Sequence, residues 1–209
     1  MRLKRQALRG KIRKPDAPIE GTYCWTACYR CCSSSTHVAW VTSTGVQSVE
    51  TMPILHLTTL IHAPVERVFD LARCIDLHET SMTTHGETAV GGVTSGLIML
   101  GQTVTWRAKH FGIWQRLTEQ ITIYDPPHHF RDTMVAGAFK RFDHDHYFQR
   151  QGTQTRMIDV FDYTSPLGLL GFIADALVLK RYMERLLAAR NQVIKAVADS
   201  SQWQTFLPE

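Results

Sequence analysis

The stretch between Gln102 and Tyr163 constrains the fold most, because apolar side chains recur there at every second position in successive segments. These segments are Gln102–His110, Ile113–Tyr124, Phe130–Ala136, Phe142–Arg150 and Thr155–Tyr163. Alternation with a period of two predicts strands that bury one face. Glycine or proline separates each segment from the next, so the sequence predicts a run of consecutive antiparallel strands.

The residues before this run predict one further strand and two short helices. Pro53–Ile61 alternates as a strand does, and Pro64 then suits the first turn of a helix. The apolar residues of that helix recur at spacings of three and four and are Val65, Val68, Phe69 and Ala72. Beyond it we expect a second short helix over Ile75–Met82 and short, bent strands around Thr88–Val90 and Leu97–Leu100, where glycines are frequent.

A long amphipathic helix is predicted after the last strand. Ser165 and Pro166 supply a capping residue and a first-turn proline. The apolar stripe that follows extends to about Asp199 and comprises Phe172, Ala176, Leu179, Met183, Leu186, Leu187, Val193, Ile194 and Val197. A helix of roughly 30 residues would be about 45 Å long. The order of elements predicts an α+β fold, in which a curved antiparallel sheet of about seven strands surrounds the long helix and leaves room for a cavity.

Two histidines lie on the apolar face of one predicted strand. Phe142, His144, His146 and Phe148 share that face. A turn around Gly152 would place His146 opposite Asp159, His144 opposite Phe161 and Phe142 opposite Tyr163. A turn around Ala138 would place Asp132 opposite His144. The sequence therefore predicts that two histidines and two aspartates meet inside the fold.

Three interpretations of this group remain open at the level of sequence. It could be a hydrogen-bonded core network, the lining of a ligand pocket, or a metal site, because a His-x-His pair on a strand points two imidazoles the same way. Glu119, a lone acid on an apolar face, is interpreted as a strand-edge residue rather than a general acid. Trp106 and Tyr163 are interpreted as core residues rather than a ligand platform.

The first fifty residues differ from the rest in charge. They hold eight of the 23 Lys/Arg residues but only three of the 19 acids, which leaves the remainder close to neutral. We therefore expect residues 1–51 to be a disordered basic extension and Met52 to be the natural first residue of the domain. The domain is predicted over residues 52–200, with a tail at 201–209. The near-neutral domain gives no reason to expect nucleic-acid binding.

Four of the five cysteines lie in the basic extension. Cys24, Cys28 and Cys31 have the spacing of the cluster motif of radical S-adenosylmethionine enzymes, but the large barrel of alternating strands and helices that follows it in those enzymes is not predicted here. We interpret these residues as structural or adventitious thiols. Cys74 stands alone in the domain. A reducing, cytoplasmic setting is expected, and no segment approaches the roughly 20 apolar residues of a membrane span.

The domain resembles the SRPBCC superfamily, also called START-like or helix-grip, which includes polyketide cyclases and lipid-transfer proteins. The segment Ile61–Leu71, which contains the strand-to-helix step at Ala63 and Pro64, carries the resemblance together with the element order. Further stretches resemble one bacterial ligand-binding subgroup, namely Trp106–Gly112, Gly137–Phe139, His144–His146, Ser165–Gly168 and Arg190–Asn191. The resemblance covers about residues 52–200.

The resemblance implies that a small hydrophobic or amphipathic ligand binds between the sheet and the last helix, without a metal or other cofactor. The expected ligand-binding residues are Trp106, His110, Asp132, Met134, Phe142, His144, His146, Phe148, Met157, Asp159, Phe161, Tyr163, Leu179 and Met183. A second hypothesis is a cyclase or dehydratase in which His144 or His146 acts as a general base beside Asp132 or Asp159. A third is a regulatory module that docks a protein partner.

Overall fold

The computed structural model describes residues 54–165 and 178–207 of the 209-residue chain. Its elements are β1 (Ile54–Ile61), α1 (Val65–Ala72), α2 (Ile75–Ser81), the 3-10 turn η1 (Thr83–His85), β2 (Thr88–Gly92), β3 (Thr103–His110), β4 (Ile113–Asp125), β5 (His129–Ala136), β6 (Arg141–Gln151), β7 (Gln154–Thr164), α4 (Lys180–Ala198) and α5 (Trp203–Phe206). The predicted basic extension, its four cysteines and the predicted first turns of the long helix lie outside the described residues.

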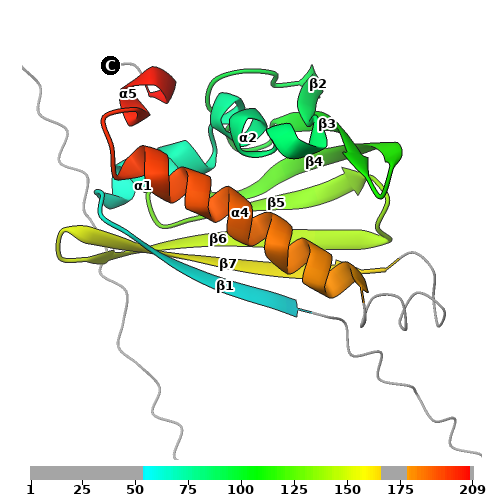
Figure 1. The fold of residues 1–209 in the computed structure, drawn as a ribbon. Helices are drawn as coiled ribbons and strands as arrows, with labels where there is room; N and C mark the ends of the chain where they lie inside the picture. The colour runs from blue at the N-terminus through cyan, green and yellow to red at the C-terminus, as the bar shows by residue number, and fades with distance from the viewer. Residues whose placement is uncertain (1–53, 166–177, 208–209) are drawn as a thin grey trace, which may run out of the picture. The chain divides into compact units, whose positions relative to one another are not determined.

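Seven antiparallel strands form one sheet in the order β1-β7-β6-β5-β4-β3-β2 (Figure 1). Strands β2 to β7 are joined one after another, and β1 pairs with β7 on the far side. The predicted registers are confirmed, because Asp132 pairs with His144 and Asp159 with His146. The alternation of the sequence therefore sets which residues share the helix-covered face.

Helices cover one face of this sheet. In Figure 1, α4 runs across the sheet, and α1 and α2 lie over the same face. The buried side of α4 includes Met183, Leu187, Ile194 and Val197, spaced at helical intervals. The predicted α+β, helix-grip arrangement is confirmed. No helix in the described residues is long and apolar enough to span a membrane.

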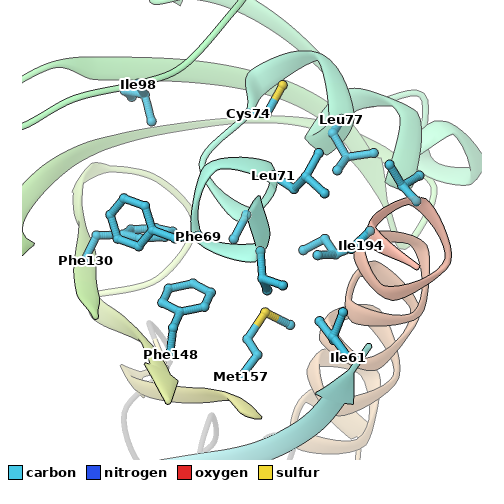
Figure 2. Close-up of a cluster of buried hydrophobic side chains, with 14 of the residues drawn as sticks. Ile61, Phe69, Leu71, Cys74, Leu77, Ile98, Phe130, Phe148, Met157 and Ile194 are labelled. Carbon is cyan, nitrogen blue, oxygen red and sulfur yellow. The ribbon is translucent and has the colours of Figure 1, made fainter. Parts of the chain in front are cut away.

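Aromatic packing fills the end of the fold where α1 meets the sheet. Figure 2 shows Phe69 of α1 beside Phe130 and Phe148 of the sheet. The ring of Phe69 lies 5.6 Å from that of Phe130 and 5.4 Å from that of Phe148, both edge to face. Met157 of β7 and Ile194 of α4 complete this cluster. The larger of the two buried hydrophobic clusters thus lies where α1 meets the sheet.

Three details of the strand prediction were wrong. Leu97–Leu100 is not a strand, since only Leu97 forms an isolated bridge, with Cys74, and Gly96 and Gly101 on either side have positive φ. In β4, alternation puts Ile113, Ile121 and Ile123 on one apolar face. A bulge shifts the register between Ile121 and Ile123, however, so that Tyr124 packs against the core in place of Ile123. Ile113 is 65% exposed.

The domain also extends beyond residue 200, where the sequence analysis placed the start of a tail. Trp203, Phe206 and Leu207 are partly buried against the main core cluster. The guanidinium of Arg67 in α1 lies 4.2 Å from the centre of the Trp203 ring. The short helix α5 therefore packs onto the domain.

We predict that Trp203→Ala lowers the free energy of unfolding by about 2 kcal/mol, because it removes a partly buried ring and its contact with Arg67. Urea unfolding followed by circular dichroism measures the loss. The exposed neighbour Gln202 provides a matched control, and Gln202→Ala should change stability by no more than about 0.5 kcal/mol. Equal stability of both variants would show that α5 does not contribute to the fold.

Candidate functional site

A cavity of about 430 Å³ lies between the helix-covered face of the sheet and the helices α2 and α4. Strands β3 to β7 contribute its floor, and residues of α4 contribute its roof. One part of the lining is aromatic and aliphatic, with Phe139, Phe142, Phe161, Leu179 and Met183. The other part carries most of the polar groups. Such a mixture is typical of small-molecule sites.

Eight of the fourteen predicted ligand-binding residues line this cavity, namely Trp106, His110, Asp132, Phe142, His144, Phe161, Leu179 and Met183. The other six do not belong to the lining: Met134, His146, Phe148, Met157, Asp159 and Tyr163. Phe148 and Met157 are covered by α1 and its core cluster, and Tyr163 is fully buried against Phe139 and Phe161. The alternation of the sequence correctly predicts that these residues lie on the helix-covered face of the sheet. It does not predict which part of that face a helix packs against and which part lines the cavity.

Two imidazoles and two carboxylates meet across β5, β6 and β7, and we call Asp132, His144, His146 and Asp159 the His/Asp belt. His146 directs Nε2 at Asp132 Oδ1, 2.9 Å away, and Nδ1 at Asp159 Oδ1, 2.7 Å away. His144 is held more loosely, with Nε2 3.3 Å from Asp159 Oδ1 and Nδ1 3.7 Å from Asp132 Oδ2. Asn191 of α4 donates a 2.6 Å hydrogen bond to Asp159 Oδ2. The belt thus links three strands to the long helix.

The pKa values of the two belt histidines are shifted in opposite directions. Burial alone would lower the pKa of His146, but its contacts with both carboxylates outweigh burial and raise it. Burial and the proximity of His146 together lower the pKa of His144. The pKa of Asp132 falls to about 2 despite burial, because the histidines and Arg190 favour its charged form. Of the two imidazoles, the belt therefore favours a proton on His146.

The belt also satisfies the spacing of a metal site. One ligand atom from each of Asp132, His144 and His146 lies within 4.8 Å of the others. His146 Nε2, however, is hydrogen-bonded to Asp132 at 2.9 Å, and Nδ1 lies 2.7 Å from Asp159 Oδ1 in an ion-pair contact, so both ring nitrogens already face a carboxylate. A ring nitrogen that carries a proton has no lone pair for a metal. The geometry favours a polar network over a metal site, and Asp132 and His144 of this network also line the cavity.

Glu119 is a cavity residue, and its interpretation as a strand-edge residue was wrong. It lies in β4, between β3 and β5, where it pairs with Val104 and Met134. Its Oε1 accepts a 2.7 Å hydrogen bond from Trp106 Nε1. The accessible part of the side chain faces the cavity. Burial, with a smaller effect of the charge on Asp132, raises the pKa of Glu119 to about 8, so the group is a neutral acid at pH 7.

Several polar cavity residues were missed by the sequence analysis. His78 stacks on Trp106 with ring centres 4.1 Å apart, and its Nε2 lies 2.7 Å from Glu87 Oε1. His110, which was predicted, contacts the hydroxyl of Tyr182 at 2.7 Å. His78 and Glu87 lie in or after short helices, where no periodic pattern distinguishes an inward side chain. Tyr182 follows Leu179 by three positions, so the helical stripe could have identified it.

Comparison with known proteins supports the fold. No family model and no curated protein matches the chain. The solved structure of TTHA0849 from Thermus thermophilus superposes with a TM-score of 0.56 at 22% identity, covering 70% of this chain and 99% of that one. The ZhuI aromatase/cyclase from Streptomyces sp. R1128 superposes with a TM-score of 0.57 at 13% identity, over 71% of this chain and 94% of that one.

A plant protein aligns over a similar length. Ginseng major latex-like protein 151 from Panax ginseng has a TM-score of 0.54 at 17% identity, over 70% of this chain and 97% of the ginseng protein. This chain shares the helix-grip fold of these structures. The resemblance seen in the sequence is therefore confirmed at the level of fold. At these identities the structural neighbours do not specify a ligand or a reaction, because one fold hosts many functions.

We predict that Asp159→Asn lowers the free energy of unfolding by about 3–5 kcal/mol, because it removes one of the two carboxylates that flank the buried His146. The pKa of Asp159 is lowered by the histidines, which outweigh its burial, so its contribution is present above pH 3.8 and is lost as pH falls below it. Urea unfolding at pH 6 and pH 3 should show the difference from wild type shrinking in acid.

A control for this variant lies three residues along the same strand. Asp162 pairs with Arg141 at 2.6 Å on a partly exposed part of β7. Asp162→Asn should cost no more than about 1 kcal/mol, since exposed ion pairs contribute little. An effect of Asp159→Asn as small as that of Asp162→Asn would contradict the role of the belt.

We predict that Glu119→Gln stabilises the protein at alkaline pH. The ordinary pKa of 4.5 applies to the unfolded chain and about 8 to the folded one, so wild type loses stability as pH rises from 4.5 to 8. Each unit of pKa corresponds to about 1.4 kcal/mol, and we expect a gain of roughly 2 kcal/mol or more at pH 8 and little change at pH 4. Glu184→Gln on the surface of α4 should show no such pH dependence.

Proposed function

We propose that this protein binds a small hydrophobic or amphipathic ligand in the cavity between the sheet and α4. The observation that carries the proposal is the cavity itself. Its volume of about 430 Å³ falls within the range of roughly 300–1,000 Å³ in which small-molecule sites are found. A fold that packed its core completely would retain no space of this size.

The apolar part of the lining suits the body of such a ligand. Phe142 and Phe161 pack with ring centres 5.0 Å apart, and Phe139 stands edge-on to Phe142 at 5.8 Å. Leu179 and Met183 of α4 face them from the other side of the cavity. Contact with these groups would remove apolar ligand surface from water, at about 25 cal/mol per Å².

The polar part of the lining suits an oxygen-bearing end of the ligand. Neutral Glu119 is a hydrogen-bond donor at neutral pH, and Asp132 and His144 lie on the neighbouring strands β5 and β6. A few placed polar groups in an apolar site set the orientation of a ligand rather than the bulk of its affinity. We therefore propose that the ligand lies with its apolar body among the phenylalanines and its polar end toward Glu119.

Binding of the neutral fluorophore N-phenylnaphthylamine to the full chain tests the proposal. We expect one saturable site per protein molecule, seen as a rise in fluorescence on titration. Native mass spectrometry of the purified protein tests in addition whether a molecule remains bound through purification. A linear, unsaturable fluorescence response would contradict an internal site.

We predict that Ala108→Phe weakens binding of N-phenylnaphthylamine by about tenfold or more, because the new ring occupies the cavity that Ala108 lines. The matched control is Ala136→Phe at the exposed end of β5, which should leave the affinity unchanged. Thermal melting of both variants verifies that they fold. Equal affinities in a folded Ala108→Phe variant and in wild type would place the probe elsewhere on the protein.

A further inference from the structure

Three arginines line the cavity, and they differ in how their charges are balanced. Arg73 donates two hydrogen bonds to Asp70, of 2.7 and 2.9 Å, and a third to the carbonyl of Ile98. Arg116 lies on β4 and is exposed. Arg190 of α4 is only 6% exposed. Arg190 is therefore the buried cation among the three, and a buried cation requires a group that balances its charge.

Few partners reach the Arg190 guanidinium. Its Nη2 donates a 2.8 Å hydrogen bond to the carbonyl of Ala72, the last residue of α1. Its buried Nε has no hydrogen-bond partner among residues 54–165 and 178–207. No carboxylate oxygen in that described part of the chain lies within 4.0 Å of the guanidinium. Buried charges in proteins are normally paired, so this arrangement is costly as it stands.

The acids nearest to Arg190 are engaged with other groups. Arg190 influences the pKa values of Glu87, Glu119 and Asp132, but it pairs with none of them. Glu87 contacts His78 at 2.7 Å, and Asp132 contacts His146 at 2.9 Å. Glu119 accepts a hydrogen bond from Trp106 and, because burial raises its pKa, it carries no charge at neutral pH. The cavity lining thus holds the unpaired cation Arg190, neutral Glu119, and two carboxylates, Glu87 and Asp132, that are each engaged with a histidine.

We propose that the ligand of this cavity carries an anionic oxygen head group, of the carboxylate class, which pairs with Arg190. The inference rests on the proposed ligand-binding function and specifies its ligand. A carboxylate accepts hydrogen bonds only, and both Arg190 and protonated Glu119 are donors that line the same cavity. A negative head group beside Glu119 would also hold its proton more firmly. The apolar body of the ligand then extends toward Phe142 and Phe161.

A purely structural role for Arg190 makes a different prediction. Its bond to Ala72 satisfies a carbonyl at the C-terminal end of α1, where a cation is favourable. If this were its whole role, replacing Arg190 would lower stability, but it would not change the preference of the cavity between a charged and an uncharged ligand. The ratio of the affinities for a charged and an uncharged ligand therefore distinguishes a structural role of Arg190 from a ligand-binding one.

The test is displacement of N-phenylnaphthylamine from the full chain by decanoate and by decanamide, which share one apolar tail and differ in the charge of the head. We expect wild type to bind decanoate more tightly than decanamide by about tenfold or more, the usual effect of a hydrogen-bonded buried charge pair. Arg190→Gln should reduce that ratio to near one while still binding the neutral fluorophore. Arg190→Lys should keep part of the preference, because it keeps the charge without the planar fork.

Arg185→Gln is the matched control, because it removes an exposed arginine of α4 that does not line the cavity. Its ratio should equal that of wild type. Equal displacement by both compounds in wild type would overturn the inference and leave the ligand-binding function standing. Retention of the full preference in Arg190→Gln would also overturn it. If the fluorophore does not bind wild type at all, the proposed function itself fails.

Discussion

The placement of His146 between Asp132 and Asp159 is the constraint on which much of the structure depends. It joins the three strands β5, β6 and β7, because buried His146 is hydrogen-bonded to Asp132 and lies 2.7 Å from Asp159 in an ion-pair contact. Asn191 extends the same network to α4, because it donates to the second oxygen of Asp159. The long helix is therefore positioned by a directional polar contact as well as by apolar packing. Because residues of α4 line the cavity opposite the sheet, the network also holds α4 at its distance from the sheet there.

The helix-covered face of the sheet is filled by side chains at one end and lines the cavity at the other. At one end the ring of Phe69 of α1 contacts Phe130 and Phe148 of the sheet within a large buried cluster (Figure 2). At the other end Phe142 and Phe161 face Leu179 and Met183 across the cavity. Apolar surface is buried at both ends, but at the second end a ligand would complete the burial. We consider this division of the core to be the structural basis of the proposed function.

Local patterns in the sequence predicted most of the sheet, and eight of the fourteen residues predicted to bind a ligand line the cavity. The registers that bring Asp132, His144 and Asp159 together follow from alternation and from glycine-containing turns, which are local signals. The bulge in β4 and the irregular Leu97–Leu100 segment follow from tertiary packing, and alternation does not report them. Trp106, the partner of Glu119, lies on the neighbouring strand β3, but the partner of Arg190 comes from α1, 118 positions away, and a single sequence does not reveal such a contact.

The pairing of β1 with β7 has a consequence for how the chain folds. The paired residues of these strands are 94 to 108 positions apart in sequence, whereas the other neighbouring strands in the sheet follow one another directly. Contacts of such long range are slow to form, because a long loop must close before they add stability. On the ribosome, β1 emerges first and remains unpaired until β7 has been synthesised. Closure of this edge is thus the late step that completes the sheet.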